Sequence, residues 1–393
     1  MSKPNSRRCA IALAAALALP VAAAAAAPSY AEVVAMDGAS GSHPVAPLTR
    51  GPDGLLYGVA SEGGAFGRGS VFRVEADGRT TLLHSFADDG SEGVYPSAGL
   101  LLASDGWLYG GTADGFPDHG SIFRISTAGE FALVHVFTAA DHGAHGPAWA
   151  LVQDEGGSFY GVSLGIGWGE VFRMAPDGTL ALLHVFEDKA DGAWPSGPLL
   201  RGRDGTLYGT TSHAHGAQGG TVFAIGREGR LQTLHTFASA TDGCSPQGSL
   251  AEGRDHRIWG MAYFCGPQGA GGETDDGLGT IFSVGPHGDF AVAHVFHYDD
   301  PLGWEPQGGL VADAQGTLHG TASGGGANLG GTVFSFSPAG KGRVLHAFAW
   351  GSATDGMAPA AAPTLLPDGS LYGTTWIGGA TLDGTVYKVS PAR

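Results

Sequence analysis

One short word, an apolar residue followed by an aromatic ring or a histidine and then a glycine, returns seven times along this chain. Its middle residues are Tyr57, Tyr109, Tyr160, Tyr208, Trp259, His319 and Tyr372. A repeat of about fifty residues is typical of proteins in which each repeat is one supersecondary unit that buries its core against its neighbours. The word therefore predicts a repetitive scaffold, and it says little about function.

The repeats contain up to four strand signals in a constant order. A proline opens a small apolar stretch, a two-residue turn such as Asp53-Gly54 follows, and the strand with the aromatic-glycine word comes next. After a glycine-rich loop come a Gly-Ser/Thr-Val-Phe strand, a second tight turn and a strand in which Leu, His and Phe alternate, as in 83–86. Asp-Gly between apolar runs is typical of hairpins, and alternation with period two is typical of half-buried strands.

We therefore predict an all-β fold, a seven-bladed β-propeller of four-stranded antiparallel blades. A linear β-solenoid is the alternative, but two hairpins in every repeat favour the propeller. The predicted domain covers 32–393, with blades at about 44–86, 96–137, 147–186, 195–237, 246–296, 306–348 and 359–390. The seventh repeat ends after its third strand, so we expect segment 32–37 to supply the outer strand of the last blade and to close the ring.

The N-terminus has the composition of a secretory leader. Lys3, Arg7 and Arg8 precede an alanine-rich apolar run, which predicts a signal peptide over 1–31 with cleavage after Ala27 or Ala31. A membrane anchor is the alternative. We expect a secreted or periplasmic protein that does not insert into the membrane once the leader is removed. In an oxidising compartment Cys244 and Cys265 are expected to form a disulfide, with two free thiols as the alternative.

Several sequence motifs of this chain resemble those of a known bacterial repeat family. The segments 207–212, 220–223 and 233–237 are similar to the extracellular Gloeo/Verruco (GloVer) tandem repeat, and the resemblance covers nearly all of the chain after the leader. It implies a secreted or surface-attached repeat protein with a β-propeller-like fold. The resemblance implies no set of catalytic residues, so it assigns no catalytic role to any residue of this chain.

Candidate functional residues are those that break the repeat in the longer loops, because ligand sites of propellers gather on the face with variable loops. Neutral imidazoles beside a carboxylate suit Zn²⁺ or acid–base chemistry, and acidic runs suit Ca²⁺. The histidine candidates are His142, His145, His213 and His215, and the weaker acidic candidates are Glu273, Asp275 and Asp276. Solvated loops are the alternative for both groups, and the sequence predicts no cofactor outright.

Aromatic side chains form the other group of candidates. Trp194 and Trp304 stand just before blade prolines, and Tyr263 begins the longest loop. Flat rings on a polar loop face suit stacking on sugars, and capping of the blade core is the alternative. The six recurring strand histidines, such as His235, are instead expected to have a structural role as hydrogen-bonding residues. Six copies spaced around a propeller cannot converge on one site.

Charge limits the class of partner. The formal net charge of −17 disfavours nucleic acid and anionic lipid surfaces. We predict a monomeric, non-catalytic module that binds an extracellular glycan or protein on its long-loop face. A carbohydrate-active enzyme, such as a polysaccharide lyase, and a purely structural envelope protein are the alternatives.

Overall fold

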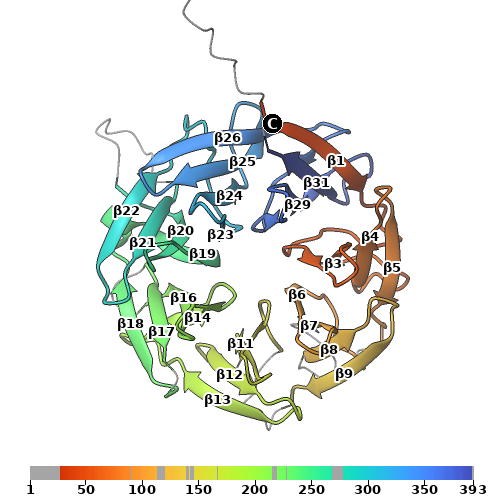
Figure 1. Cartoon of the computed structure of the whole chain (residues 1–393), viewed down its shortest axis with the longest axis horizontal. Helices are drawn as coiled ribbons and strands as arrows, with labels where there is room; N and C mark the ends of the chain where they lie inside the picture. The colour runs from red at the N-terminus through yellow and green to blue at the C-terminus, as the bar shows by residue number, and fades with distance from the viewer. Residues whose placement is uncertain are drawn as a thin grey trace, which may run out of the picture.

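The computed structural model describes residues 27–89, 91–112, 120–138, 141, 146–165, 167–214, 219–226, 228–267 and 278–391. Seven antiparallel sheets stand around a central axis, and each sheet runs from the axis to the rim (Figure 1). The prediction of a seven-bladed propeller is confirmed. Among the residues described, no helix is both long and apolar enough to cross a bilayer.

The strands follow the repeat in order from the axis outward. Blade one contains β2 (Thr49–Arg50), β3 (Leu56–Ala60), β4 (Ser70–Val74) and β5 (Thr80–Ser85). Blade two contains β6 (Ala98–Leu102), β7 (Leu108–Thr112), β8 (Ser121–Ile125) and β9 (Phe131–Val136). Blade three contains β10 (Val152–Gln153), β11 (Phe159–Ser163), β12 (Glu170–Met174) and β13 (Leu180–Val185). Blade four contains β14 (Ala193–Pro195), β15 (Leu200–Arg201), β16 (Leu207–His213), β17 (Thr221–Ile225) and β18 (Leu231–Thr236).

The short helix α1 (Ser239–Asp242) leads into blade five. Blade five contains β19 (Cys244–Glu252), β20 (Ile258–Phe264), β21 (Thr280–Val284) and β22 (Phe290–Val295). Blade six contains β23 (Leu310–Ala312), β24 (Leu318–Ala322), β25 (Leu329–Ser337) and β26 (Lys341–Ala349). Blade seven contains β28 (Thr364–Leu365), β29 (Leu371–Thr375), β31 (Thr385–Ser390) and β1 (Ser29–Ala35), with β27 (Gly356–Met357) and β30 (Ile377–Gly378) paired beside it.

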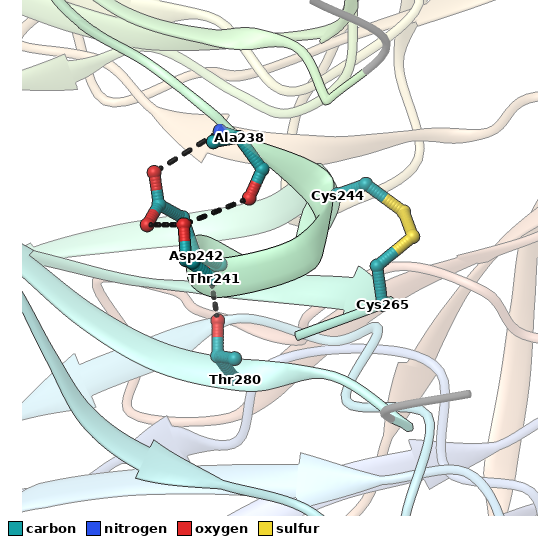
Figure 2. Close-up of a disulfide and its surroundings, with 6 residues drawn as sticks. All are labelled: Ala238, Thr241, Asp242, Cys244, Cys265 and Thr280. Carbon is teal, nitrogen blue, oxygen red and sulfur yellow. Dashed lines mark hydrogen bonds between the residues drawn. A yellow bond between two sulfur atoms is a disulfide. The ribbon is translucent and has the colours of Figure 1, made fainter. Parts of the chain in front are cut away.

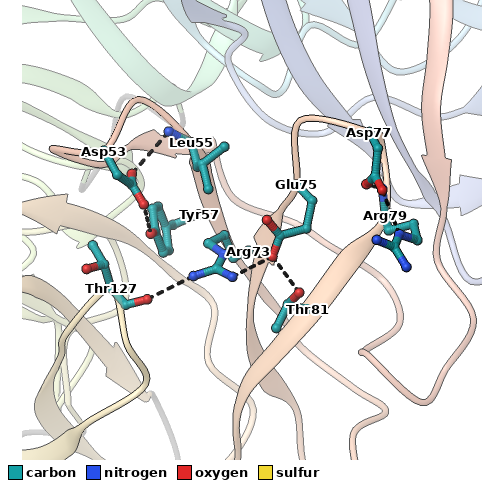
Figure 3. A network of polar contacts seen from close by, with 9 residues as sticks. All are labelled: Asp53, Leu55, Tyr57, Arg73, Glu75, Asp77, Arg79, Thr81 and Thr127. Carbon is teal, nitrogen blue, oxygen red and sulfur yellow. Dashed lines mark hydrogen bonds and ion pairs between the residues drawn. The ribbon is translucent and has the colours of Figure 1, made fainter.

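The aromatic-glycine word has a packing role that blade one illustrates. A Cβ atom on Gly58 would lie 2.5 Å from the ring of Phe72, so only glycine lets that ring cross the strand. The Tyr57 hydroxyl donates to Oδ2 of Asp53 at 2.6 Å and so ties the strand to the Asp-Gly turn (Figure 3). The word is therefore part of the scaffold, as its recurrence suggested.

The recurring histidines join each blade to the next. His235 Nε2 lies 3.0 Å from Oδ2 of Asp242 in the following link, and its ring stacks at 3.6 Å on Phe290 of the next blade. Five more histidine–carboxylate pairs occupy equivalent junctions: His84–Glu92, His135–Asp141, His184–Asp191, His294–Asp300 and His346–Asp355. This arrangement supports the structural interpretation of these histidines.

The N-terminal strand closes the ring, as predicted. Strand β1 lies outermost in the last blade and pairs antiparallel with β31 (Figure 1). It spans Ser29–Ala35 and so begins three residues before the expected segment 32–37. Tyr30 explains the earlier start, because its ring stacks at 3.6 Å on His346, as Phe290 does on His235. Cleavage after Ala31 would remove this contact, whereas cleavage after Ala27 would keep it.

Candidate functional site

The antiparallel order of the strands divides the loops between two faces. The tight turns lie on one face, which we call the turn face. The loops between the second and third strands and the links between blades lie on the opposite loop face. The predicted site residues that the structure describes, His213, Tyr263, Trp194 and Trp304, all belong to segments of the loop face.

Three rings form a cluster at the boundary of blades three and four. Trp168 and Trp194 lie 5.3 Å apart between ring centroids, and Trp194 and His213 are also 5.3 Å apart. Trp168 remains 38% exposed and Trp194 42% exposed. Two large apolar rings held in water at one place are unusual for a structural role, because packing would be expected to bury them. We call Trp168, Trp194 and His213 the ring cluster.

The backbone holds the ring cluster rigidly. The N–H of Trp194 donates to the Trp168 carbonyl at 2.7 Å, and β14 pairs with β16 so that Ala193 lies opposite His213. Trp194 has a φ of 55°, a conformation that is rare for a bulky residue. Pro195 has a fixed φ and packs where a Cβ of Gly169 would lie 2.4 Å away. The backbone that carries Trp194 is therefore fixed before a ligand arrives, which lowers the ordering cost of binding.

The other two predicted aromatic residues are used in packing at blades five and six. Trp304 stacks at 4.7 Å on Tyr298, and its ring fills the space in which a Cβ of Gly324 would lie. The Tyr263 hydroxyl is 3.3 Å from Oε2 of Glu305, and burial raises the pKa of Tyr263 to about 12. Its phenol is therefore neutral at physiological pH and is poorly suited to be a general base.

The predicted disulfide is present in blade five. Cys244 follows α1 at the start of β19, and Cys265 follows the end of β20, with their Cα atoms 5.3 Å apart (Figure 2). The bridge ties the link into the blade to the start of its longest loop. Next to it, the Asp242 carbonyl accepts a hydrogen bond from the Thr280 hydroxyl at 2.8 Å (Figure 2).

This pairing has a simple chemical consequence. Alkylation of the denatured chain without reductant, after removal of the leader, is expected to label neither cysteine. Alkylation after reduction is expected to label both. Mass spectrometry distinguishes the two results, and two labelled thiols in the unreduced sample would contradict the bridge.

The remaining predicted site residues lie outside the residues that the structure describes. They are His142, His145, His215, Glu273, Asp275 and Asp276. Within the described part of the chain, no three His, Cys, Asp or Glu side chains are arranged to hold a metal ion. Zn²⁺ and Ca²⁺ binding at these residues therefore stay predictions.

Glu170 is a candidate that the sequence analysis missed. It stands where the other blades have Ser or Thr at the start of the third strand, for example Thr280. Its side chain is only 4% exposed, and among the described residues its Oε1 has no hydrogen-bond partner. Burial and, secondarily, the Asp141 carboxylate raise the pKa of Glu170 to about 7. The signal that could have identified it was its departure from the Ser or Thr that begins the third strand in the other blades.

The junction around Glu170 differs from the other blade junctions. His135 Nε2 lies 3.5 Å from Asp141, whereas the other five histidines lie 2.6 to 3.2 Å from their carboxylates. Asp141 accepts hydrogen bonds from the backbone N–H and the hydroxyl of Thr138 at 2.8 and 2.9 Å, much as Asp242 does from Ala238 and Thr241, so the longer histidine distance is what sets this junction apart. A buried carboxyl group therefore lies at a loosened junction, two residues from Trp168 of the ring cluster.

Comparison with solved structures supports the fold. The chain is similar to virginiamycin B lyase from Staphylococcus aureus, with a TM-score of 0.62 and 16% identity over 93% of this chain and 99% of that one. It is also similar to the extracellular domain of BT4673 from B. thetaiotaomicron, with a TM-score of 0.55 and 12% identity over 93% of this chain and 42% of that one. At these identities the likeness concerns the fold alone.

Comparison of the sequence is more specific. No curated protein shows a significant match to the chain. The Gloeobacter/Verrucomicrobia repeat model matches three overlapping ranges, 24–168, 115–273 and 147–387, which together span nearly all of the propeller. These ranges include the words on which the resemblance was based. The chain therefore belongs to the Gloeobacter/Verrucomicrobia repeat family.

Proposed function

We propose that this protein is a secreted, non-catalytic binding module that binds a glycan through the ring cluster on its loop face. The observation that carries the proposal is the pair of exposed, rigidly held rings of Trp168 and Trp194. The apolar face of a sugar ring stacks on a flat indole, while His213 at the edge offers a hydrogen bond to a hydroxyl.

Secretion is part of the same proposal. A disulfide between Cys244 and Cys265 is stable in an oxidising compartment, and the basic and apolar N-terminus has the composition of a secretory leader. In that setting the protein would meet polysaccharides of a cell surface or of the surroundings. Its net charge of −17 favours neutral glycans over strongly anionic ones.

A glycan array followed by calorimetry tests the proposal. The wild-type chain is expected to bind a set of glycans, and Trp194→Ala is expected to weaken binding at least tenfold, or about 1.4 kcal/mol. Trp168→Ala should act in the same direction. Trp350→Ala is the matched control, because Trp350 is 67% exposed but lies outside the ring cluster. Equal losses in all three variants, or no loss in any of them, would contradict the proposal.

A glycan-cleaving enzyme is the second candidate, and Glu170 is the specific observation that favours it. A carboxyl group with a pKa of about 7 is protonated often enough at neutral pH to act as a general acid. Release of reducing ends and absorbance of unsaturated uronates would detect the activity. Glu170→Gln should then abolish turnover while glycan binding persists. If neither binding nor turnover is found, a structural envelope role becomes the better account.

A further inference from the structure

A cleft of about 510 Å³ opens on the turn face between blades three and four, on the side opposite the ring cluster. It lies between the turn that joins β10 to β11 and the turn that joins β17 to β18. Its lining includes Tyr160, Arg173, Leu183, Arg201, Leu207 and Ile225. This volume is within the range typical of small-ligand sites.

The equivalent arginines of blades one and two have different partners. In blade one the equivalent arginine, Arg73, donates to the Thr127 carbonyl of blade two at 3.1 Å and pairs with Glu75 (Figure 3). In blade two the guanidinium of Arg124 lies 4.6 Å from the ring centroid of Trp107. An arginine therefore occupies the same strand position in three successive blades, and its partners differ from blade to blade.

Blade three has lost those partners. The sequence places Ala175 at the position of Glu75 and Ser158 at the position of Trp107. Arg173 instead donates from Nη2 to the Ser158 hydroxyl of its own blade at 2.7 Å, and its other neighbours, Tyr160 and Asp154, also line the cleft. Arginine has five N–H donors, so the guanidinium of Arg173 retains capacity for a ligand that enters the cleft.

The charges of the cleft are nearly balanced. Arg201 lies 3.3 Å from Glu155, whose side chain is 88% exposed, so this pair is easily exchanged for a ligand. Asp154 accepts a hydrogen bond from the Tyr160 hydroxyl at 2.8 Å and also lines the cleft, as does Glu228. Two arginines against three acidic side chains offer donors and acceptors without attracting an anion.

Apolar side chains form part of the same wall. Leu207 and Ile225 are buried, and Leu183 is half-buried beside them. The cleft is thus apolar on one side and lined with planar guanidinium and carboxylate groups on the other. This combination matches a sugar ring. Such groups form paired hydrogen bonds with adjacent hydroxyls, while the C–H face of the ring rests on the leucines.

We propose that this cleft is a second binding site, which holds a neutral sugar unit between Arg173 and Arg201. Because it lies on the face opposite the ring cluster, it does not depend on the proposed function. Two sites on opposite faces would let one molecule connect two glycan chains.

The test uses a chain in which the ring cluster has been removed by Trp168→Ala and Trp194→Ala. Cellobiose, maltose and xylobiose are titrated at millimolar concentration and followed by saturation-transfer NMR, with di-galacturonate as the anionic comparison. At least one neutral disaccharide is expected to bind. Arg173→Ala and Arg201→Ala, made separately in this background, are each expected to weaken that binding at least tenfold.

Arg124→Ala is the matched control, because it removes the same residue type from the same strand position one blade earlier. It should leave binding unchanged, and binding of the neutral disaccharide should vary little between 50 and 500 mM NaCl. Three results would overturn the proposal: no neutral disaccharide binds, the arginine variants bind as well as their parent, or only di-galacturonate binds. None of these results bears on the ring cluster, which is tested separately in the wild-type chain.

Discussion

A chain truncated to begin at Asp37 is expected to lose the cooperative unfolding of the closed ring. The truncation removes β1, whose partner β31 is then left as an open edge on the outside of blade seven. It also removes Met36, which is 1% exposed and whose N–H donates to the Gly384 carbonyl at 2.9 Å. Loss of this strand and its buried side chains should lower the free energy of unfolding by on the order of 5 kcal/mol.

Two shorter truncations make this result specific, and all three are measured by calorimetry. A chain that begins at Pro28 retains all of β1 and should unfold like the full-length protein. A chain that begins at Glu32 loses the stack of Tyr30 on His346 and should fall between the two. A chain that begins at Asp37 and melts within 2 °C of the Pro28 chain would contradict closure by this strand.

Glu170→Thr, which restores the residue type of the other blades, is expected to stabilise the protein at alkaline pH. The pKa of Glu170 is about 7 in the folded protein against an ordinary value of 4.5, so the unfolded chain loses its proton first as the pH rises. The folded state is therefore penalised increasingly between pH 4.5 and pH 7, and fully above pH 7. After allowance for solvent near the blade edge, we expect Glu170→Thr to gain about 2 kcal/mol at pH 8.

The sign of the pH dependence separates this effect from a simple improvement in packing. At pH 4 the carboxyl group is neutral in both states, so the gain should shrink to the contribution of the hydroxyl alone. Glu155→Thr in the same blade is the control, because its carboxylate is exposed and should give little change at either pH. Denaturant melts at pH 4 and pH 8 measure both variants. A gain that is equal at the two pH values would contradict the assignment of the raised pKa to Glu170.

The sequence predicted the fold because its signals are local and repeated. Tight turns, many of them Asp-Gly, recur along the chain together with period-two strands, and the crossing of Gly58 by Phe72 has a counterpart in the other blades, for example Phe282 at Gly260. The start of β1 was harder to place, because this strand lacks the His and Phe of its counterparts. Tyr30 fills the equivalent position through a contact with His346, more than three hundred residues away, which no local pattern reveals.

The candidate site was predicted only in part, for the same physical reason. Trp194 and His213 were both singled out, but the pairing of β14 with β16 that brings them together depends on the register of blade four, and Trp168 joins them through a backbone hydrogen bond from the previous blade. Glu170 was missed because its neighbours Gly169, Val171 and Phe172 fit the Gly-Ser/Thr-Val-Phe pattern of the third strand. The cleft beside Arg173 was missed because its lining comes from turns and strands of two blades that only the folded chain brings together.

A crystal structure of the protein with a glycan identified on the array would show directly whether the ring cluster is the binding site. We expect a sugar ring stacked on the exposed face of Trp168 or Trp194, with His213 within hydrogen-bond distance of a hydroxyl. A glycan bound on the loop face at another blade, with both tryptophans still exposed to solvent, would contradict it.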